Sequence, residues 1–569
     1  MSDITPVSDS ATPTLRGAVW SVVIALLASL PFLNKAFHID DVLYLAVADQ
    51  ILQTPLDPYG LTQGKTILWD AIDGKPDTLF QIDFNPPLWK YMLAGGIALL
   101  GKEEWKLHLL STLAIVAGSL GIYFASCRFT RRPIWCVVMI ILSPFFWPGV
   151  NLMLEAPLLA FLAWGIYFQW RSWDRGTVAD ALLAGLFVGL AILTKYTAVL
   201  FVPFFVLGSL MKRRPISLIA LVPATLLLGL WCLHNQWMYG QLHITSHGVV
   251  FRPDRWIGRF FSVLRIIGAV SVFFPFACWA WVKRGWFHLI LVGVVAIISL
   301  GMAWLDLDQA IDWYLQRNGK MPAGLEPFFL LFTSLGAFTL LMFSIVSLQS
   351  ARRSSLSADE HQWEIWIVVL VLFNIVSVPF NAVRHLLVLF MALTWLSARL
   401  ADRLQLRILP AFVAVISTSL AFLLAAGDYE YANGYRTFAQ TQIRDAKHHF
   451  PKVWVTGTWG YKYYAEREGA ITYYPGIQNT AEGRPIAGDV IFHSQLLNWA
   501  PIMMTVEGEQ PAAVRLLPAQ LPARLMMPGI CYYGVGTELL PWGAIIGREP
   551  HGFEVPPLDA IVIYEIQSP

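Results

Sequence analysis

The sequence predicts a polytopic α-helical membrane protein with about thirteen transmembrane helices, followed by a smaller extracytoplasmic α/β domain. Three observations support this fold class. Of the 569 residues, 56% are hydrophobic and only 14% are charged, and the mean hydropathy is +0.56, above the range of soluble globular domains. The apolar residues form runs long enough to cross a hydrocarbon core of about 30 Å. After residue 427 the pattern changes to short strand-like runs separated by Pro and Gly turns.

Apolar segments before residue 427 are expected to be membrane spans. Their approximate bounds are 17–36, 105–126, 134–152, 156–170, 178–194, 197–211, 216–235, 260–282, 286–304, 327–348, 363–380, 385–401 and 408–426. The first segment lacks a small-residue cleavage site, so we expect it to be retained in the membrane. The apolar stretch after Pro86 and Pro87 is too short to span comfortably, and we expect a helix lying at the interface.

The distribution of basic residues predicts the orientation of the spans. One face carries Lys and Arg densely in short connections, at Arg16, Arg128, Arg131, Arg132, Arg171, Arg175, Lys212, Arg213, Arg214, Lys283, Arg284, Arg352, Arg353, Arg399, Arg403 and Arg407. On the other face they are spread over longer loops that also contain many acids. The dense face should be cytoplasmic. We therefore expect a transmembrane domain over 1–426 with an external loop at 37–104, and an extracytoplasmic domain over 427–569.

Composition also limits the partners that we expect. The net charge of +2 is close to balance, so nucleic acid is not an expected partner. The five cysteines show neither a disulfide framework nor the spacing of a metal-thiolate site. No internal repeat is visible, which weakens a transporter interpretation, because many transporters are built from duplicated halves.

Two adjacent carboxylates, Asp40 and Asp41, come directly after the first expected span. Carboxylates at a membrane boundary are costly unless they have a use. Asp40 and Tyr44 are four residues apart, so a short helix would place them on one face, where the phenol could orient the carboxylate. An acidic N-cap on an interfacial helix explains the same residues about equally well.

Two basic residues are expected at the external ends of spans. Lys195 lies in a very short turn between two spans, on the side away from the basic face. A buried or interfacial lysine suggests a functional site with an anionic partner, and snorkelling is the alternative. Arg384 stands beside His385 at an expected helix start, where the helix dipole does not favour a cation, so a ligand phosphate is a reasonable partner.

The external loop near residue 245 contains His243 and His247, four residues apart, and Arg255. Two histidines at this spacing could share a helix face and hold a metal ion together with a carboxylate. Most such pairs in exposed loops hold nothing. The sequence therefore leaves the presence of a divalent metal open.

Several motifs together resemble the GT-C superfamily of glycosyltransferases, in particular its protein O-mannosyltransferase and aminoarabinose transferase branch. Asp40-Asp41-Val42-Leu43-Tyr44 resembles the Asp-Glu-x-x-Tyr motif that follows the first span in that family, with Asp in place of Glu. Asn85-Pro86-Pro87-Leu88, with Lys90 nearby, resembles its His-Pro-Pro-Leu motif, with Asn in place of His. Further similar segments are Met153 to Leu158, where Glu155 stands in place of the usual Asp, Gly189 to Tyr196, Val383 to Leu387, and Gly457 to Gly469 with Gly488-Asp489-Val490.

The resemblance implies transfer of a sugar from a polyprenyl-phosphate donor to an extracytoplasmic acceptor, with inversion at the anomeric carbon. It implies Asp40 as the general base. Lys195 and Arg384, with Lys90 or Arg255, would neutralise the leaving lipid phosphate. Glu155 and Tyr44 would position Asp40 or the acceptor. The expected catalytic residues are thus Asp40, Asp41, Tyr44 and Glu155, and the expected substrate-binding residues are Asp83, Asn85, Lys90, Lys195, His243, His247, Arg255 and Arg384.

Expected partners are the lipid-linked donor, an acceptor such as lipid A, a glycan, a protein or another lipid, and membrane lipid. The expected location is a bacterial inner membrane with the N-terminus in the cytoplasm. Two other classes of protein stay open. A flippase or transporter for lipid-linked sugars would place charges near the middle of spans, and a non-catalytic membrane scaffold would leave Asp40 and Lys195 free to vary.

Overall fold

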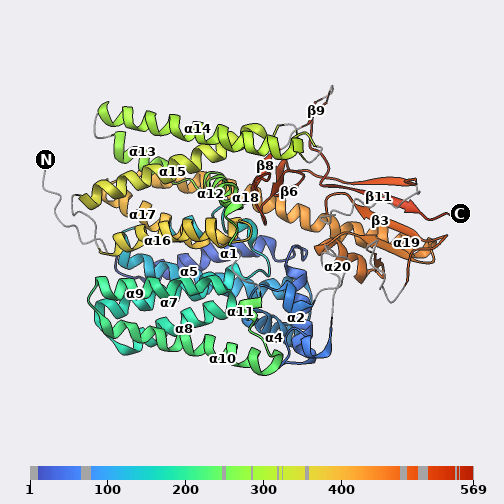
Figure 1. Cartoon of the computed structure of the whole chain (residues 1–569), viewed down its shortest axis with the longest axis horizontal. Helices are drawn as coiled ribbons and strands as arrows, with labels where there is room; N and C mark the ends of the chain where they lie inside the picture. The colour runs from blue at the N-terminus through green and yellow to red at the C-terminus, as the bar shows by residue number, and fades with distance from the viewer. Residues whose placement is uncertain are drawn as a thin grey trace.

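The structure is a computed structural model, and it describes residues 11–65, 78–246, 251–282, 286–316, 319–322, 324–352, 358–473, 483–497, 510–544, 547–549 and 552–567. Long helices lie side by side in one region, and the sheet of the C-terminal part lies at the other end of the molecule (Figure 1). The predicted class, a polytopic helical membrane protein with a C-terminal part that contains a mixed sheet, is confirmed.

Seven helical segments in the described part of the chain are long and apolar enough to cross a membrane. They are Leu15–Phe32, Glu104–Phe129, Pro215–Tyr239, His288–Gln316, Glu326–Gln349, Val383–Arg403 and Ile408–His449. Shorter apolar helices cover Leu88–Leu100, Val178–Thr194 and Tyr196–Met211.

The first half of the helical region follows the expected order of elements. Its helices are α1 (Leu15–Ser29), α5 (Glu104–Phe129), α6 (Pro133–Ile141), α7 (Glu155–Arg175), α8 (Val178–Thr194), α9 (Phe201–Met211), α10 (Leu221–Tyr239) and α11 (His243–Ser246). One difference concerns the segment expected over 134–152, where α6 ends at Ile141. Pro144 and Pro148 follow within two turns, and proline cannot supply the backbone N–H that a continuing helix needs.

The second half contains α12 (Trp256–Val270), α13 (Phe274–Val282), α14 (Trp286–Gln316), α15 (Glu326–Arg352), α16 (Ala358–Val376), α17 (Leu387–Arg403) and α18 (Ile408–Phe438). The segment expected over 260–282 is broken into α12 and α13. Pro275 stands at the second position of α13, where a proline is tolerated at a helix start but not inside a helix.

The loop between α1 and α5 has helices of its own. It contains α2 (Asp41–Gln53), α3 (Leu79–Ile82) and α4 (Leu88–Leu100). The helix α4 begins after Pro87, as the double proline predicts. Both α2 and α4 lie at the end of the helical region that faces the C-terminal sheet (Figure 1). Residues just before α2 are therefore placed between the two parts of the molecule.

The C-terminal part begins without a break, because α18 runs from Ile408 to Phe438 and so passes through the expected boundary at residue 427. It continues with α19 (Arg444–His449) and α20 (Trp459–Arg467). Its sheet has the order β2-β1-β3-β11-β4. The strands are β1 (Val453–Thr456), β2 (Ile471–Thr472), β3 (Val490–Ser494), β4 (Ala513–Leu517) and β11 (Asp559–Glu565).

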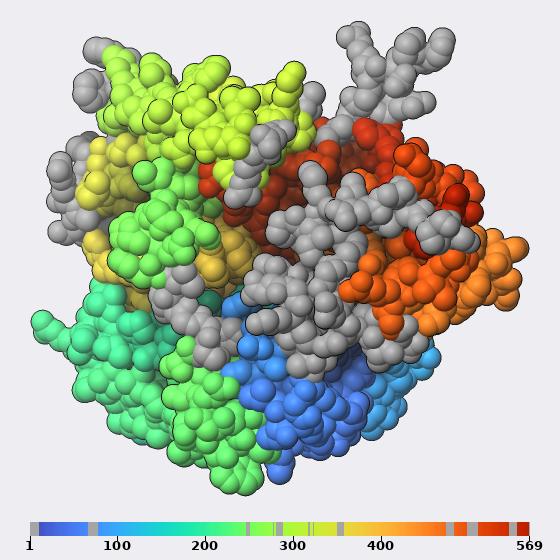
Figure 2. Space-filling view, turned by 45° about the vertical axis from the view of Figure 1, so that its right-hand side comes forward, coloured from blue at the N-terminus to red at the C-terminus, as the bar shows by residue number. Residues whose placement is uncertain are grey.

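The sheet is mixed. Strand β1 pairs in parallel with β2 and β3, whereas β11 is antiparallel to β3 and β4. Shorter pairs join β5 (Ala523–Arg524) to β8 (Gly543–Ala544), β6 (Met526–Met527) to β7 (Ile530–Cys531), and β9 (Gly547–Glu549) to β10 (Gly552–Glu554). In the space-filling view the C-terminal part, orange to red, lies directly against the helical region (Figure 2).

Candidate active site

Asp40 and Arg384 form an ion pair at the end of the helical region that faces the sheet. Asp40 immediately precedes α2, and Arg384 lies in the 3-10 turn Val383–Leu386 that leads into α17. Arg384 Nη2 is 3.0 Å from Asp40 Oδ2. The side chains keep 17% and 24% of their surface exposed. The structure therefore brings together two predicted site residues from distant parts of the chain and leaves them within reach of a ligand.

The backbone before Asp40 is strained at Ile39 and is supported by contacts with α20. Ile39 has a φ of +50°, which a β-branched residue rarely adopts. The Phe37 N–H donates to Tyr464 Oη at 2.8 Å. A Cβ added to Gly460 would lie 2.4 Å from the Phe37 carbonyl oxygen, so α20 packs directly on this turn. The C-terminal part thus supports the backbone conformation that presents Asp40.

Asp41 has a different environment from its neighbour. Its side chain is fully buried. Its Oδ1 accepts the Leu152 N–H at 2.9 Å, and its Oδ2 accepts the His38 N–H at 3.2 Å. These bonds hold the start of α2 to the turn before α7. Asp41 is therefore a structural acceptor in this arrangement, and Asp40 is the carboxylate that a ligand can reach.

Lys195 and Glu155 form a second, more buried ion pair. Lys195 caps the C-terminal end of α8, and Glu155 is the first residue of α7, where the helix dipole favours an anion. Lys195 Nζ lies 2.9 Å from Glu155 Oε1, with side chains only 8% and 10% exposed. Arg384 also interacts electrostatically with Glu155. The anionic partner expected for Lys195 is thus a side chain of the same protein.

A third pair joins Asp83 and Lys90, both essentially fully buried. Lys90 Nζ is 2.9 Å from Asp83 Oδ2 and also donates to the backbone carbonyls of Asn85 and Pro86, at 3.2 and 3.0 Å. The ammonium lies 4.9 Å from the centre of the Tyr44 ring. Burial raises the pKa of Asp83, which the charge of Lys90 opposes. The backbone of the Asn85-Pro86 segment therefore supplies two carbonyl acceptors to Lys90, and Asn85 acts here through its backbone.

These pairs are parts of one charged cluster. Asp40 interacts electrostatically with Asp83 and Lys90. Burial raises the pKa of Tyr44 well above its usual value, and the neighbouring carboxylates of Asp40, Glu155 and Asp83 raise it further. The cluster consists of Asp40, Tyr44, Asp83, Lys90, Glu155, Lys195 and Arg384. Three carboxylates face three cations, so an anionic ligand that takes one cation releases the carboxylate paired with it.

His243 lies in a buried aromatic group instead of an open loop. Its ring stacks on Tyr59 with centroids 4.9 Å apart, and it meets Phe80 edge-on at 4.8 Å. Its Nδ1 is 3.0 Å from the Tyr196 hydroxyl. His247, its expected metal-binding companion, lies outside the described residues. Within the described part of the chain, no group of three or more His, Cys, Asp and Glu side chains is arranged to hold a metal ion.

Arg255 is exposed at the end of the short 3-10 helix Pro253–Arg255. Arg255 interacts electrostatically with Asp254 and Arg259, and Arg252 also acts on both of these residues. In the part of the chain that the structure describes, no recorded ion pair joins Arg255 to the charged cluster around Asp40.

Four buried residues beneath the cluster were missed by the sequence interpretation. Asp428 Oδ2 accepts hydrogen bonds from Lys35 Nζ at 2.5 Å and from the Tyr533 hydroxyl at 2.7 Å, and it lies 2.9 Å from His38 Nε2. Burial alone would lower the pKa of His38, but the carboxylates of Asp428 and Asp41 raise it above its ordinary value. The available signal was Asp428 itself, the first acidic residue after the apolar run 408–426 in the same helix.

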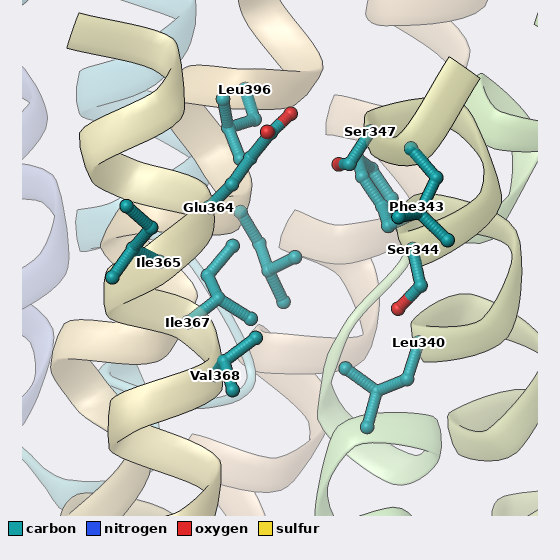
Figure 3. Close-up of a pocket in the computed structure, with 11 residues that line it drawn as sticks. Leu340, Phe343, Ser344, Ser347, Glu364, Ile365, Ile367, Val368 and Leu396 are labelled. Carbon is teal, nitrogen blue, oxygen red and sulfur yellow. The ribbon is translucent and has the colours of Figure 1, made fainter. Parts of the chain in front are cut away.

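A pocket of about 340 Å³ opens between α15, α16 and α17 (Figure 3). Its wall is mainly apolar, with side chains such as Leu340, Phe343 and Ile367. Ser344, Ser347 and Glu364 supply its polar groups. None of the residues of the charged cluster lines it.

Fold and site together define a polytopic helical membrane protein with a charged cluster where helix ends meet the loop before α2. Residues 85–239 match the model of the family described as dolichyl-phosphate-mannose-protein mannosyltransferase. This stretch contains Asn85, Lys90, Glu155 and Lys195. The resemblance inferred from the motifs is thereby confirmed.

Two solved structures are similar to the chain. ArnT from Cupriavidus metallidurans, bound to undecaprenyl phosphate, shares 13% identity with a TM-score of 0.42, over 98% of this chain and 99% of that chain. The S. cerevisiae protein O-mannosyltransferase Pmt1-Pmt2 complex, bound to the sugar donor, shares 15% identity with a TM-score of 0.29, over 44% of this chain and 38% of that chain. No curated protein sequence matches the chain.

Proposed function

We propose that the protein is an inverting membrane glycosyltransferase that moves a sugar from a polyprenyl-phosphate donor to an extracytoplasmic acceptor. The observation that carries this proposal is the partly exposed Asp40–Arg384 pair, which combines a carboxylate base with a phosphate-binding cation at one place. The family match over residues 85–239 supports the class of donor, because that family is named for a lipid-phosphate sugar. Lipid A, a glycan, a protein or another lipid would serve as acceptor.

In the proposed reaction Asp40 accepts a proton from the acceptor hydroxyl or amine. The acceptor atom forms a bond to the anomeric carbon from the face opposite the phosphate. The bond between that carbon and the phosphate oxygen breaks, and polyprenyl phosphate leaves with the electron pair. Arg384 and Lys195 stabilise the negative charge that grows on the leaving phosphate, and preorganised charges of this kind are often the largest catalytic contribution.

The ion pairs suggest how donor binding prepares the base. Arg384 holds Asp40 at 3.0 Å, and a guanidinium binds a phosphate in a bidentate manner as readily as a carboxylate. When the donor phosphate takes Arg384, Asp40 loses its partner and is free to approach the acceptor. Tyr44, whose ring centre lies 4.9 Å from Lys90 Nζ, would then limit where the carboxylate moves.

We further propose that the protein lies in a bacterial inner membrane with thirteen spans, a cytoplasmic N-terminus and a periplasmic C-terminal part. Residues 1–426 would be the transmembrane domain and 427–569 the periplasmic domain. Ion pairs between helices support the assignment of Arg128 and Arg132 to one and the same face. Arg128 pairs with Asp174 and Asp359 at 2.6 and 3.0 Å, and Arg132 pairs with Asp402 at 2.9 Å, at the opposite ends of the helices from Asp40.

The proposal is tested by incubating purified protein in lipid nanodiscs with a panel of polyprenyl-phosphate sugars, including the mannosyl form, and measuring release of polyprenyl phosphate. Mass spectrometry of envelope glycans and glycolipids from cells lacking the gene identifies the acceptor. Donor-dependent release supports a transferase. Movement of intact donor across the bilayer without release would identify a flippase instead.

Lys195 gives a specific prediction for donor binding. Lys195→Met should raise the donor KM by about tenfold or more, since a charge-assisted contact to phosphate contributes roughly 1.5–3 kcal/mol. Because that change leaves Glu155 buried without its cation, the double variant Glu155→Gln/Lys195→Met should show the same loss in a better-folded protein. Lys102→Met removes a lysine from a partly exposed pair with Asp49 and should leave the KM unchanged. An unchanged KM in both Lys195 variants removes this residue from the donor site.

A further inference from the structure

A segment of the C-terminal part crosses the candidate site. We call residues 529–538 the strap. Its Val535 N–H donates to the Asn381 carbonyl at 2.6 Å, and the Val383 N–H donates to the Tyr532 carbonyl at 3.5 Å. Asn381 and Val383 lie immediately before Arg384 in the chain. The strap therefore holds the backbone that carries the guanidinium.

The strap also reaches the other side of the cluster through Tyr533. This fully enclosed tyrosine donates its hydroxyl to Asp428 Oδ2 at 2.7 Å and accepts from Asn151 Nδ2 at 3.2 Å. Its ring packs edge-on against His38, with centroids 5.8 Å apart. Since Asp428 also binds His38, the tyrosine is linked to the turn that presents Asp40. The strap thus contacts the backbone next to Arg384 and also the residues that hold the turn before Asp40.

The strap is itself anchored in the helical region. Arg265 of α12 donates to the backbone carbonyls of Gly536 and Thr537 at 2.6 and 2.9 Å. Arg265 is fully buried and lies 3.4 Å from the buried carboxylate of Asp306 in α14. Tyr314 donates to the Glu538 carbonyl at 3.1 Å. These bonds fix the end of the strap to helices other than the one that follows Arg384.

We propose that the strap sets the distance between Asp40 and Arg384, with Tyr533 as the positioning residue on the Asp40 side. The tyrosine acts on the Asp40 side through its contacts with Asp428 and His38. Positioning matters because a displacement of about 1 Å in a catalytic group can cost on the order of 100-fold in rate. Because the backbone at Ile39 is strained, the turn before Asp40 should change its conformation when its support weakens. This inference rests on the proposed transferase function.

The test is Tyr533→Phe, which deletes one hydroxyl and keeps the ring. We expect kcat to fall between about 10-fold and 100-fold, with the donor KM changed less than about twofold, because the phosphate-binding cations stay in place. The matched control is Tyr123→Phe, which removes the hydroxyl of another buried tyrosine that also donates to a backbone carbonyl, that of Thr14, at 3.3 Å. A control that loses kcat as strongly as Tyr533→Phe would overturn the proposal, because the effect would then be general destabilisation.

Hydrogen exchange provides a readout that does not depend on turnover. In Tyr533→Phe the amides of residues 37–44 and 381–386 should exchange faster than in the parent, and in Tyr123→Phe they should not. Unchanged exchange in both variants overturns the proposal, whatever the activity. If Tyr533→Phe exchanges faster at these amides but the parent protein releases no polyprenyl phosphate, the positioning role of Tyr533 is kept and the transferase function is rejected.

Discussion

At the scale of single residues, the structure separates two carboxylates that look alike in the sequence. Asp40 is partly exposed and faces Arg384, whereas Asp41 is buried and accepts two backbone N–H groups. The sequence places both at a membrane boundary, and their different roles depend on contacts with Leu152 and Arg384. Such contacts join segments far apart in the chain, so spacing alone does not reveal them.

His38 gives a prediction for pH dependence. Its folded-state pKa is raised above 6.5 by Asp428 and Asp41, and Lys35, Tyr533 and Tyr431 are its other charged or titratable neighbours. A raised pKa means that the protonated imidazole stabilises the folded state. This stabilisation is complete below pH 6.5 and is lost as the pH rises through the higher folded-state pKa. Thermal unfolding between pH 6 and 9 measures the loss.

The matched variant for that measurement is His38→Gln, whose amide can donate to Asp428 without titrating. We expect its unfolding temperature to vary less with pH than that of the parent over the same range. Parallel curves for the two proteins would show that His38 does not titrate in this way.

At the scale of secondary structure elements, apolar runs predicted the long helices well, and prolines explain where the helices differ. The run at 134–152 is mostly apolar, but Pro144 and Pro148 end its helix early. The strands at Val453, Val490 and Ile561 were visible as β-type runs. Their order in the sheet was not predictable, because β1 lies between β2 and β3 through contacts that no local pattern encodes.

The crossing of α12 and α15 depends on two glycines. A Cβ on Gly336 would lie 1.9 Å from the Leu264 carbonyl oxygen, and one on Gly268 would lie 1.8 Å from the Phe332 carbonyl oxygen. Small residues allow helix backbones in membranes to approach this closely. Gly336→Ala should therefore destabilise the protein by about 1–3 kcal/mol, the usual cost of overpacking.

The control for this prediction is Gly293→Ala in α14, where an added Cβ meets nothing within 4 Å. Unfolding temperatures in detergent compare the two variants. Gly336→Ala should lower the temperature clearly and Gly293→Ala should not. Equal temperatures would mean that α12 and α15 do not approach as closely as described.

At the scale of the whole molecule, the two parts of the chain are joined more closely than a division at residue 427 suggests. The helix α18 continues to Phe438, and α20 packs on the turn before Asp40. The strap is hydrogen-bonded to the backbone of Asn381 and Val383, close to Arg384. The sequence singled out Asp40, Lys195 and Arg384 as candidate site residues, and the structure brings them into one charged cluster. It did not predict that the C-terminal part helps to build it, because Asp428 and Tyr533 belong to none of the recognised motifs.

The proposed orientation can be tested along one long helix. Gln405 precedes α18 and Lys447 lies in α19 beyond its end, and both side chains are exposed. A membrane-impermeant maleimide should label Lys447→Cys in intact spheroplasts and Gln405→Cys only after the membrane is permeabilised. The reverse pattern would invert the topology and place Asp40 on the cytoplasmic side. Cys531 is not a suitable label site, because it is buried in the strap.

The central claim is that Asp40 is the base of a sugar transfer, and the turnover of purified Asp40→Asn tests it most directly. The amide keeps the shape of the carboxylate but cannot accept the proton, so sugar transfer per folded molecule should fall by about 10²- to 10⁴-fold. Asp41→Asn is the matched comparison, and it should reduce stability far more than turnover, because it alters a buried acceptor of two backbone N–H groups. A folded Asp40→Asn protein that transfers sugar at nearly the parent rate would contradict the account.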